Sequence, residues 1–462
     1  MSEKKGSEKG IEQGLVENIY STGFDDLEKN VVDYCKRLII DSLGVTFPGI
    51  NAPGCRNVID IVTLWGCNSG SSLLILGEKV PPPMAALANS TMMHAVDFDD
   101  TLDETALHTF VSVLPASLSI SEAIGGVDGK RLLTAIVLGV DVICRVSLAI
   151  RRPLSWIRSS TCGSFGAATA AGKLMNLDRN GLTNVLGIVY SQTSGNCQGL
   201  LEGRLIKRMQ PGFASQAGVM SAFLAKGGIT GSHDFLEGPY GYYNLYEHGK
   251  YDYMPVIERL GEHFGISDLS IKPYPCCRMT HSSIDAALKL REFVKEKEEK
   301  IDSVNVSASK MVTEMVGKPF VMGTDPQVDA QFSIPYTVSS ALLRGDVFLG
   351  DFEKEAIMDN KARSLAEKVF VREDSSLPAK DILHVNMEVS MKDGTKFDAR
   401  IKAPLGNPLN PLSMDQCREK FRKCLEYSGI KIGSDRVNQL LDMIDNLEKV
   451  KDVGIITELM KQ

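Results

Sequence analysis

The sequence lacks the features of several common functional classes. The longest apolar run, at 132–144, is interrupted by Asp141 and falls short of the roughly 18 apolar residues of a membrane-spanning helix. The N-terminal stretch "MSEKKGSEKGIEQG" is polar and charged, without the apolar core of a signal peptide. A formal net charge of −7 argues against the broad basic face that nucleic-acid binding requires. We therefore expect a cytoplasmic protein that binds neither membranes nor nucleic acid.

Paired cysteines and abundant aromatic residues are missing as well. The 10 cysteines include no Cys-x-x-Cys pair, and the neighbours Cys276 and Cys277 lack metal-ligand spacing. We expect reduced thiols, no metal centre, and a packing role for Cys276 and Cys277, since no thiol-activating base is evident. Aromatic residues make up only 7% of the chain, too few for the carbocation pocket of a terpene cyclase.

The length of 462 residues exceeds what one hydrophobic core usually supports, so two domains are expected. Helical periodicity runs almost throughout residues 11 to about 265. Alternation of apolar and polar residues at 302–309 and 384–403 indicates strands, and the second segment turns at "KDGT" as a β-hairpin. A helix is expected from Ser282 to Glu299.

A proline-rich and asparagine-rich linker, "PLGNPLNPLS" (404–413), follows the hairpin. Ser413 and Gln416 then form the pattern of a capping box, and a last helix covers about 434–448. The predicted fold class is mainly α with an α+β domain. We expect an all-helical domain made of residues 1–268 and of C-terminal helices from 404–462, with an α+β lid domain inserted at 269–403.

The most unusual stretch is "HAVDFDDTLDETALHTF" (94–110), which resembles three acidic motifs. A dehalogenase-type phosphatase would need a buried strand before its first Asp, and a parallel βα pattern elsewhere. Here "ANSTMMHA" precedes the motif, and its context is helical. A prenyl-diphosphate enzyme or protonating cyclase would need a second metal-binding acidic motif or many aromatic residues, and the sequence offers neither.

Helical spacing predicts which residues of this stretch act together. His94, Asp97 and Thr101 are three and four residues apart and would share one helical face, with His108 returning near it. The remaining acids, Asp99, Asp100, Asp103 and Glu104, are expected to be surface charges or helix caps.

Five separated segments together resemble the MmgE/PrpD family. They are "HAVDFDDT" with its following histidine (94–108), "STCGSFGAATAAGKLMNLD" (160–178), "IKRMQPGFASQAG" (206–218), "KPYPCCRMTHSSIDAA" (272–287) and "DAQFSIPYTVSSAL" (329–342). The resemblance covers nearly the whole chain. It implies a helical domain with an inserted lid, a homodimer, no organic cofactor, and a small di- or tricarboxylate substrate bound between helical domain and lid.

The resemblance also implies a set of site residues. By position in the motifs, the catalytic candidates are Asp97, His108, Lys207, His281 and Tyr336. The substrate-binding candidates are Thr101, Arg208, Lys272 and Arg278. Family reactions remove a proton or carbon dioxide next to a carboxylate, which needs cations and a well-placed acid–base group.

Two departures from the family pattern leave the reaction type open. Many members have His-Pro where this chain has His108 and Thr109, and a histidine where this chain has Ile157. The leading hypothesis is a lyase, either a dehydratase or a decarboxylase, that uses no cofactor. An epimerase or isomerase needs fewer acid–base groups and is the closest alternative. A catalytically inactive carboxylate-binding member is the alternative from another class.

Overall fold

The computed structural model describes residues 10–66, 70–323 and 325–462, and the chain divides into two compact units. Unit 1 extends to Leu269 and resumes as Ser413–Gln462, whereas unit 2 is Ser270–Leu412. Most of the predicted linker therefore belongs to unit 2. The backbone N–H of Ile271 donates to Gly406 O at 2.9 Å, which ties the two ends of unit 2 together.

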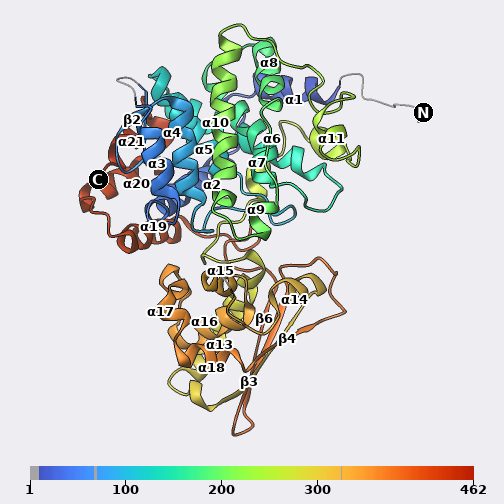
Figure 1. The fold of residues 1–462 in the computed structure, drawn as a ribbon, viewed down its shortest axis with the longest axis vertical. Coiled ribbons are helices and arrows are strands. Elements are labelled where there is room, and N and C mark those ends of the chain that lie inside the picture. The colour runs from blue at the N-terminus through green and yellow to red at the C-terminus, as the bar shows by residue number, and fades with distance from the viewer. Residues whose placement is uncertain (1–9, 67–69, 324) are drawn as a thin grey trace. The chain divides into compact units, whose positions relative to one another are not determined.

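Unit 1 is mainly helical (Figure 1). Its helices are α1 Ile11–Ser21, α2 Lys29–Gly49, α3 Cys55–Thr63, α4 Pro82–His94, α5 Phe110–Ile124, α6 Gly129–Leu148, α7 Arg158–Leu174, α8 Arg179–Tyr190, α9 Gln198–Leu201, α10 Ile206–Lys226, α11 Tyr242–Leu245, α12 Met254–Ile257, α19 Met414–Ser428, α20 Ser434–Asp445 and α21 Ile455–Leu459. Two short strands, β1 Ser71–Ser72 and β2 Lys79–Val80, pair antiparallel. The prediction of an all-helical domain was wrong in this detail, and residues 95–109 also lie outside any helix.

Small residues let α10 pack closely against two neighbouring helices. A Cβ atom on Gly218 would lie 2.6 Å from the backbone carbonyl carbon of Ala167 in α7. A Cβ atom on Gly212 would lie 2.8 Å from the carbonyl oxygen of Leu87 in α4. Only glycine permits these approaches. The close contacts fix α10, and therefore Lys207, against α4 and α7.

The C-terminal helices pack into unit 1, with α19 against α2. Phe421 of α19 meets Phe47 of α2 edge to face, with ring centroids 5.3 Å apart. The predicted capping box at the start of α19 is confirmed, because Ser413 and Gln416 exchange backbone-to-side-chain hydrogen bonds of 2.8 and 3.2 Å. This return of the chain supplies a buried cation, Lys420, to the interior of unit 1.

Unit 2 combines helices with a four-stranded sheet of order β4-β3-β5-β6. Its elements are α13 His281–Val294, β3 Ile301–Ala308, α14 Lys310–Val316, α15 Pro326–Gln331, α16 Ile334–Arg344, α17 Lys354–Ile357, α18 Asn360–Ala366, β4 Val369–Glu373, β5 Val385–Met391 and β6 Lys396–Ile401. The predicted hairpin is confirmed, with Ser390 opposite Lys396. The predicted helix at 282–299 ends earlier, at Val294, and β4 was not predicted.

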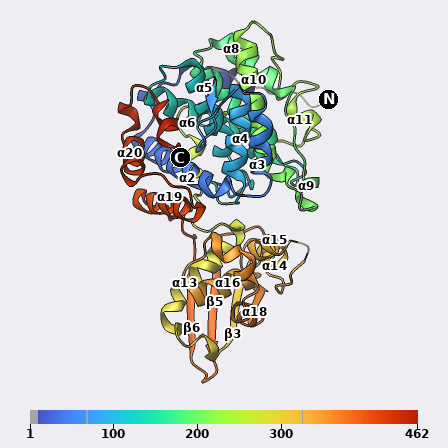
Figure 2. The same ribbon diagram turned by 60° about the vertical axis from the view of Figure 1, so that its left-hand side comes forward.

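One face of this sheet is covered and the other is open. Within unit 2, α13 contacts β5 and β6 (Figure 2), and α16 contacts β4. The strand residues that point to this face, such as Val306, Met387 and Val389, are buried in the core of the unit. The alternation of burial along β3 and β5 is therefore the period-two pattern that the sequence showed.

Two further findings concern the described part of the chain only. The nine described cysteines are free thiols. Among the described residues, no helix combines the length and apolarity needed to cross a bilayer.

We predict that Gly218→Ala destabilises unit 1. The new methyl group would push against the backbone of Ala167, so the apparent free energy of unfolding should fall by about 1–3 kcal/mol in urea titrations. Gly14→Ala in α1 is the matched control, since the nearest atom would be an ordinary 3.7 Å contact with Leu260. That variant should gain up to about 1 kcal/mol from helix propensity. Equal effects of the two substitutions would contradict the proposed close packing.

Candidate active site

The candidate site is built on the connection between α4 and α5. Helix α4 ends at His94, and the chain then turns through Asp97, whose φ of 54° is in the left-handed region. The expectation that His94, Asp97 and Thr101 share a helical face was therefore wrong. The loop folds back, with a bridge between Leu102 and Leu107 that closes it, and His94 and Asp97 both lie near Lys207.

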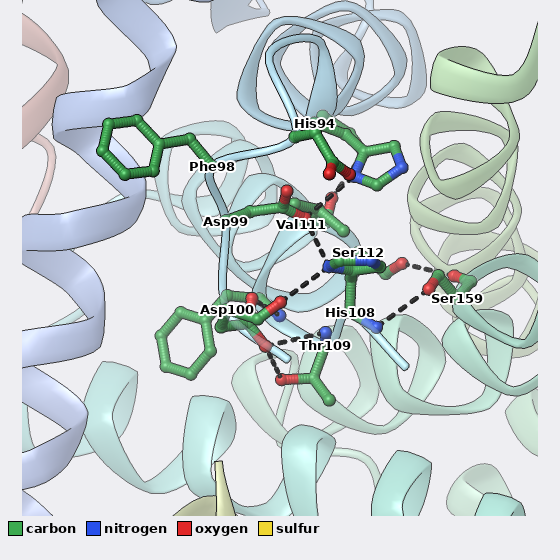
Figure 3. A network of polar contacts seen from close by, with 12 residues as sticks. His94, Phe98, Asp99, Asp100, His108, Thr109, Val111, Ser112 and Ser159 are labelled. Carbon is green, nitrogen blue, oxygen red and sulfur yellow. Dashed lines mark hydrogen bonds and ion pairs between the residues drawn. The ribbon is translucent and has the colours of Figure 1, made fainter. Parts of the chain in front are cut away.

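Asp99 is the centre of the loop. Its Oδ2 lies 2.8 Å from Nδ1 of His94 and 3.1 Å from Nδ1 of His108, so one carboxylate oxygen contacts two imidazoles (Figure 3). The two rings meet edge to face with centroids 4.9 Å apart. Asp99 has no exposed surface, so the prediction that it is a surface charge was wrong.

Asp100 is buried too, and it organises the start of α5. Its carboxylate accepts hydrogen bonds from the backbone N–H and hydroxyl of Thr109 and from the backbone N–H of Phe110, at 2.8 to 3.1 Å. A carboxylate at a helix N-terminus is favoured by the helix dipole. Burial, helped by the charge of Asp99, nevertheless raises the pKa of Asp100 to about 6. The structure thus corrects the prediction of a surface position, although Asp100 does act as a cap.

Thr109 explains part of the departure from the family pattern. A proline at this position would have neither an N–H nor a hydroxyl, and Asp100 would lose two of its three hydrogen bonds. Thr109 supplies both a backbone and a hydroxyl donor, so the threonine is matched to the buried carboxylate.

Sequence reasoning missed Asp99 and Asp100 as interior groups, together with Ser159. A signal for burial was present, because the loop joins two apolar segments that form the buried helices α4 and α5. A short connection between two buried helices has little surface on which to place adjacent charges.

His94 is held between an acceptor and a donor. Lys207 Nζ lies 3.2 Å from its Nε2, and an ammonium group only donates, so Nε2 accepts and the ring proton is on Nδ1, facing Asp99. Burial lowers the pKa of His94 to about 4, and Lys207 adds to this effect against the opposing charge of Asp99. Burial would raise the pKa of Asp99, but the two histidines together hold it well below its ordinary value.

Lys207 joins the site from α10. It lies in the first turn of this helix. Its Nζ is also 3.5 Å from Oδ1 of Asp97, and both side chains are partly exposed, at 28% and 16%. The neighbouring candidate Arg208 turns elsewhere and donates to the carbonyl oxygen of Pro53 at 2.8 Å. Thr101, another candidate, is buried in the loop with 3% exposure.

His108 presents one ring nitrogen beyond the cluster. Its Nδ1 lies 2.7 Å from the carbonyl oxygen of Asp100 as well as near Asp99, so Nδ1 carries the proton. The lone pair is then on Nε2, and the side chain is 16% exposed. The backbone N–H of His108 donates to Ser159 Oγ at 2.9 Å, at the start of α7 (Figure 3). Ile157, where the family pattern has a histidine, is the buried residue that precedes α7.

The cluster also has the composition of a metal site. His94, Asp99 and His108 offer three ligand atoms within 4.8 Å of one another. A metal-bound histidine normally donates its other ring N–H to an acceptor. Here Nε2 of His94 faces the ammonium of Lys207, which donates and cannot accept a ring N–H. This partner fits a hydrogen-bonded histidine and does not fit a metal-bound one.

The remaining candidates belong to unit 2. Arg278 NH1 donates to Nδ1 of His281 at 3.2 Å, and Nε2 of His281 donates to the carbonyl oxygen of Cys276 at 3.3 Å. Both ring nitrogens of His281 thus take part in hydrogen bonds within unit 2, and the residue is fully buried. Lys272 is also buried, with 2% exposure. This arrangement favours a role for His281 in holding Arg278.

Tyr336 has a structural environment. It is fully buried, and its hydroxyl donates to the backbone oxygen of Asp351 inside the core of unit 2. Burial raises the pKa of this hydroxyl. The structure therefore gives no support to the catalytic role expected from the motif, because the hydroxyl proton is already used in a core hydrogen bond.

We predict that His94 makes stability depend on pH. The unfolded chain protonates this histidine below about pH 6.5, but the folded protein only near its pKa of about 4. Unfolding therefore takes up a proton in this window, so the stability contributed by His94 falls as pH decreases, by about 2 kcal/mol between about pH 7 and pH 5. Asp41 and Asp100, with pKa values raised to about 6, have the opposite effect in the wild type.

The measured quantity is therefore the difference in free energy of unfolding between the wild type and a variant without His94. Free energies of unfolding of the wild type and His94→Gln are compared at both pH values by urea titration. The difference in free energy of unfolding between the two proteins should be smaller at the lower pH. A difference that stays constant would mean that folding does not depress the pKa of His94.

Comparison with known proteins identifies the family. The MmgE/PrpD N-terminal domain matches residues 13–254, and the MmgE/PrpD C-terminal domain matches residues 274–448. The first match alone spans more than half of the 462 residues.

Several curated relatives align along most of the chain. A cis-aconitate decarboxylase of Mus musculus is 26% identical over 466 residues, which cover 98% of this chain and 94% of the relative. A cis-aconitate decarboxylase of Aspergillus terreus is 24% identical over 464 residues, with 94% and 93% covered. A 2-methylcitrate dehydratase-like protein of Aspergillus oryzae is 26% identical over 178 residues, with 36% and 35% covered. The two domain matches confirm the resemblance seen in the motifs: the chain belongs to the MmgE/PrpD family.

Proposed function

We propose that the protein is a lyase, a decarboxylase or dehydratase, that acts on a small di- or tricarboxylate by acid–base chemistry without an organic cofactor. The family and the names of the relatives support an enzyme of the MmgE/PrpD type, which is a lyase. The observation that carries the chemical part is the cluster in unit 1. There a lysine ammonium and a histidine with a lone pair on Nε2 are linked to the same buried carboxylate through hydrogen bonds.

This arrangement suits reactions next to a carboxylate group. In a dehydratase, a base takes the proton from the carbon beside the carboxylate, the electron pair forms the double bond, and the hydroxyl group leaves as water after protonation. In a decarboxylase, the bond to the carboxylate carbon breaks, carbon dioxide leaves, and the remaining electron pair takes up a proton. Both reactions build negative charge that a nearby cation stabilises.

The residues of unit 1 divide these roles. Nε2 of His108 is the proposed proton acceptor, because Nδ1 is already protonated and hydrogen-bonded. Lys207 is the proposed cation that binds a substrate carboxylate and donates a proton, since its ammonium is partly exposed. The carboxylate of Asp97 attracts this ammonium and keeps it near His94. Thr101 belongs to the same loop and is buried there. In unit 2, Arg278 stays a proposed substrate-binding residue, and it donates a hydrogen bond to His281.

Substrate and roles are tested together. Candidate di- and tricarboxylates, with cis-aconitate first, are incubated with the protein, and products are detected by mass spectrometry. His108→Gln and Lys207→Met should each lower kcat by about 10²–10⁴-fold. Arg204→Gln is the matched control, because Arg204 is near Lys207 in sequence but its side chain is 71% exposed.

Three outcomes would contradict the proposal. Full activity of His108→Gln would remove the proposed base. Hydrogen exchange in deuterium oxide without loss of water or carbon dioxide would indicate an epimerase or isomerase. Binding of the acids without any turnover or exchange would indicate an inactive carboxylate-binding member of the family.

We also propose that the protein forms a homodimer, as expected for the family. The exposed side of α10 supports this proposal, because Met220, Phe223 and Leu224 follow helical spacing and are 36–38% exposed in the single chain. Three large apolar side chains on one helix face are typical of a protein contact.

The oligomeric state can be measured by light scattering coupled to size-exclusion chromatography. The wild type should have twice the chain mass of 50.4 kDa, and Phe223→Glu should shift the equilibrium towards the monomer. Lys226→Glu, a change of charge at an exposed position at the end of the same helix, should leave the mass unchanged. A wild-type protein that elutes as a monomer would refute the proposed dimer.

A further inference from the structure

Four side chains of unit 1 form one continuous chain of polar contacts. Lys207 Nζ lies 3.2 Å from Nε2 of His94, and Nδ1 of His94 lies 2.8 Å from Oδ2 of Asp99. The same oxygen lies 3.1 Å from Nδ1 of His108. The ends of the chain are partly exposed, whereas the side chains of His94 and Asp99 are almost completely buried, at 1% and 0%. The buried residues therefore connect the two groups that the proposed reaction uses.

The donor and the acceptor of each contact follow from the chemistry of Lys207 and of the carbonyl oxygen of Asp100. The ammonium of Lys207 has no lone pair, so it must donate to His94. The carbonyl oxygen of Asp100 has no hydrogen, so Nδ1 of His108 must donate to it, and the same nitrogen lies 3.1 Å from Oδ2 of Asp99. Asp99 consequently accepts from His94 and faces the N–H of His108, and a carboxylate is a side chain that accepts without donating.

We propose, on the basis of the proposed function, that Asp99 and His94 are positioning residues: Asp99 fixes His94, and together with the carbonyl oxygen of Asp100 fixes His108, as Nδ1–H tautomers. This aims the lone pair of His94 at Lys207 and leaves the lone pair of His108 on Nε2. Neither residue needs to touch the substrate. Asp99 orients the base, and His94 holds the ammonium in place. This role differs from those of the catalytic candidates and was not expected from the motif, where Asp99 was assigned to the surface.

The proposal explains why one loop needs two histidines. A neutral imidazole in water favours the proton on Nε2, which would place the lone pair of His108 towards Asp99 and bring two acceptors together. The buried carboxylate reverses that preference for His94, and together with the carbonyl oxygen of Asp100 reverses it for His108. Asp99 Oδ1 has no hydrogen-bond partner among the described residues, so the contacts of this carboxylate are concentrated on the oxygen that faces the histidines.

Tautomers are measured in the resting protein, without substrate. Nitrogen-15 NMR of histidine-labelled protein distinguishes Nδ1–H from Nε2–H, and His94→Gln and His108→Gln assign the two rings among the seven histidines. Both should be Nδ1–H, and the ring proton of His94 should lie far downfield and disappear in Asp99→Asn, whereas that of His108 keeps its hydrogen bond to the carbonyl oxygen of Asp100. An Nε2–H tautomer at either ring would overturn the proposal. So would a shift of both rings on adding stoichiometric zinc ions, because it would show that the cluster binds a metal.

The second test of the proposal measures the activity of variants. Asp99→Asn keeps the shape of the side chain and should lower kcat by about 10²–10⁴-fold while the melting temperature shows a folded protein. His94→Gln places an amide oxygen near the position of Nε2 and should recover part of the activity that His94→Leu loses, through kcat more than through KM. Equal losses for Gln and Leu would mean that His94 does not hold Lys207.

The two tests separate this proposal from the proposed function. If both tautomers are Nδ1–H but no lyase activity exists for any acid, the proposed function fails and the assignment of the chain of polar contacts stands. If lyase activity is present but either ring is Nε2–H, the positioning proposal alone fails.

Discussion

The structure of unit 1 depends on the burial of three carboxylates. Asp41, Asp99 and Asp100 are each at most 1% exposed. A charge in the interior is tolerated only when partners surround it. Lys420 pairs with Asp41 at 2.7 Å, two histidines contact Asp99, and the start of α5 donates to Asp100. Lys420 comes from the C-terminal part of the chain and the other partners from the two ends of the loop, so compensation of these charges ties α19 to α2 and the loop to α4 and α5.

Because of this requirement, distant segments of unit 1 support the same loop. Lys420 lies on α19, near the C-terminus, yet its Nζ also donates to the carbonyl oxygen of Phe98 at 2.8 Å and lies over the ring of Phe98. Lys420 therefore stabilises the loop at Phe98, and the next residue, Asp99, contacts the two histidines. The glycines of α10 set the position of Lys207 by close contact with α4 and α7. The site therefore uses the N-terminal, central and C-terminal parts of unit 1.

The departures from the family pattern have consequences of different kinds. Thr109 compensates for the missing proline with two hydrogen bonds to Asp100, so the loop keeps its support. Ile157 replaces an expected histidine with a buried apolar side chain just before the helix whose Ser159 contacts His108. The acid–base groups that remain in unit 1, His108 and Lys207, are enough for one proton acceptor and one donor. For this reason the proposed mechanism assigns both roles to them.

The sequence by itself determined the family, the mainly helical character of unit 1, the hairpin of β5 and β6, and the capping box of α19, because these depend on local periodicity and on motif order. It also singled out His108, Lys207 and Asp97. Only the tertiary structure decided that Asp99 and Asp100 lie inside, that Tyr336 donates within a core, and that His94 faces Lys207 across 113 positions of sequence. The physical reason is that burial of these charges depends on how the loop folds back on its own N–H donors, and on a cation, Lys207, from a distant helix. Spacing along the sequence does not show how the loop will fold or which helix will meet it.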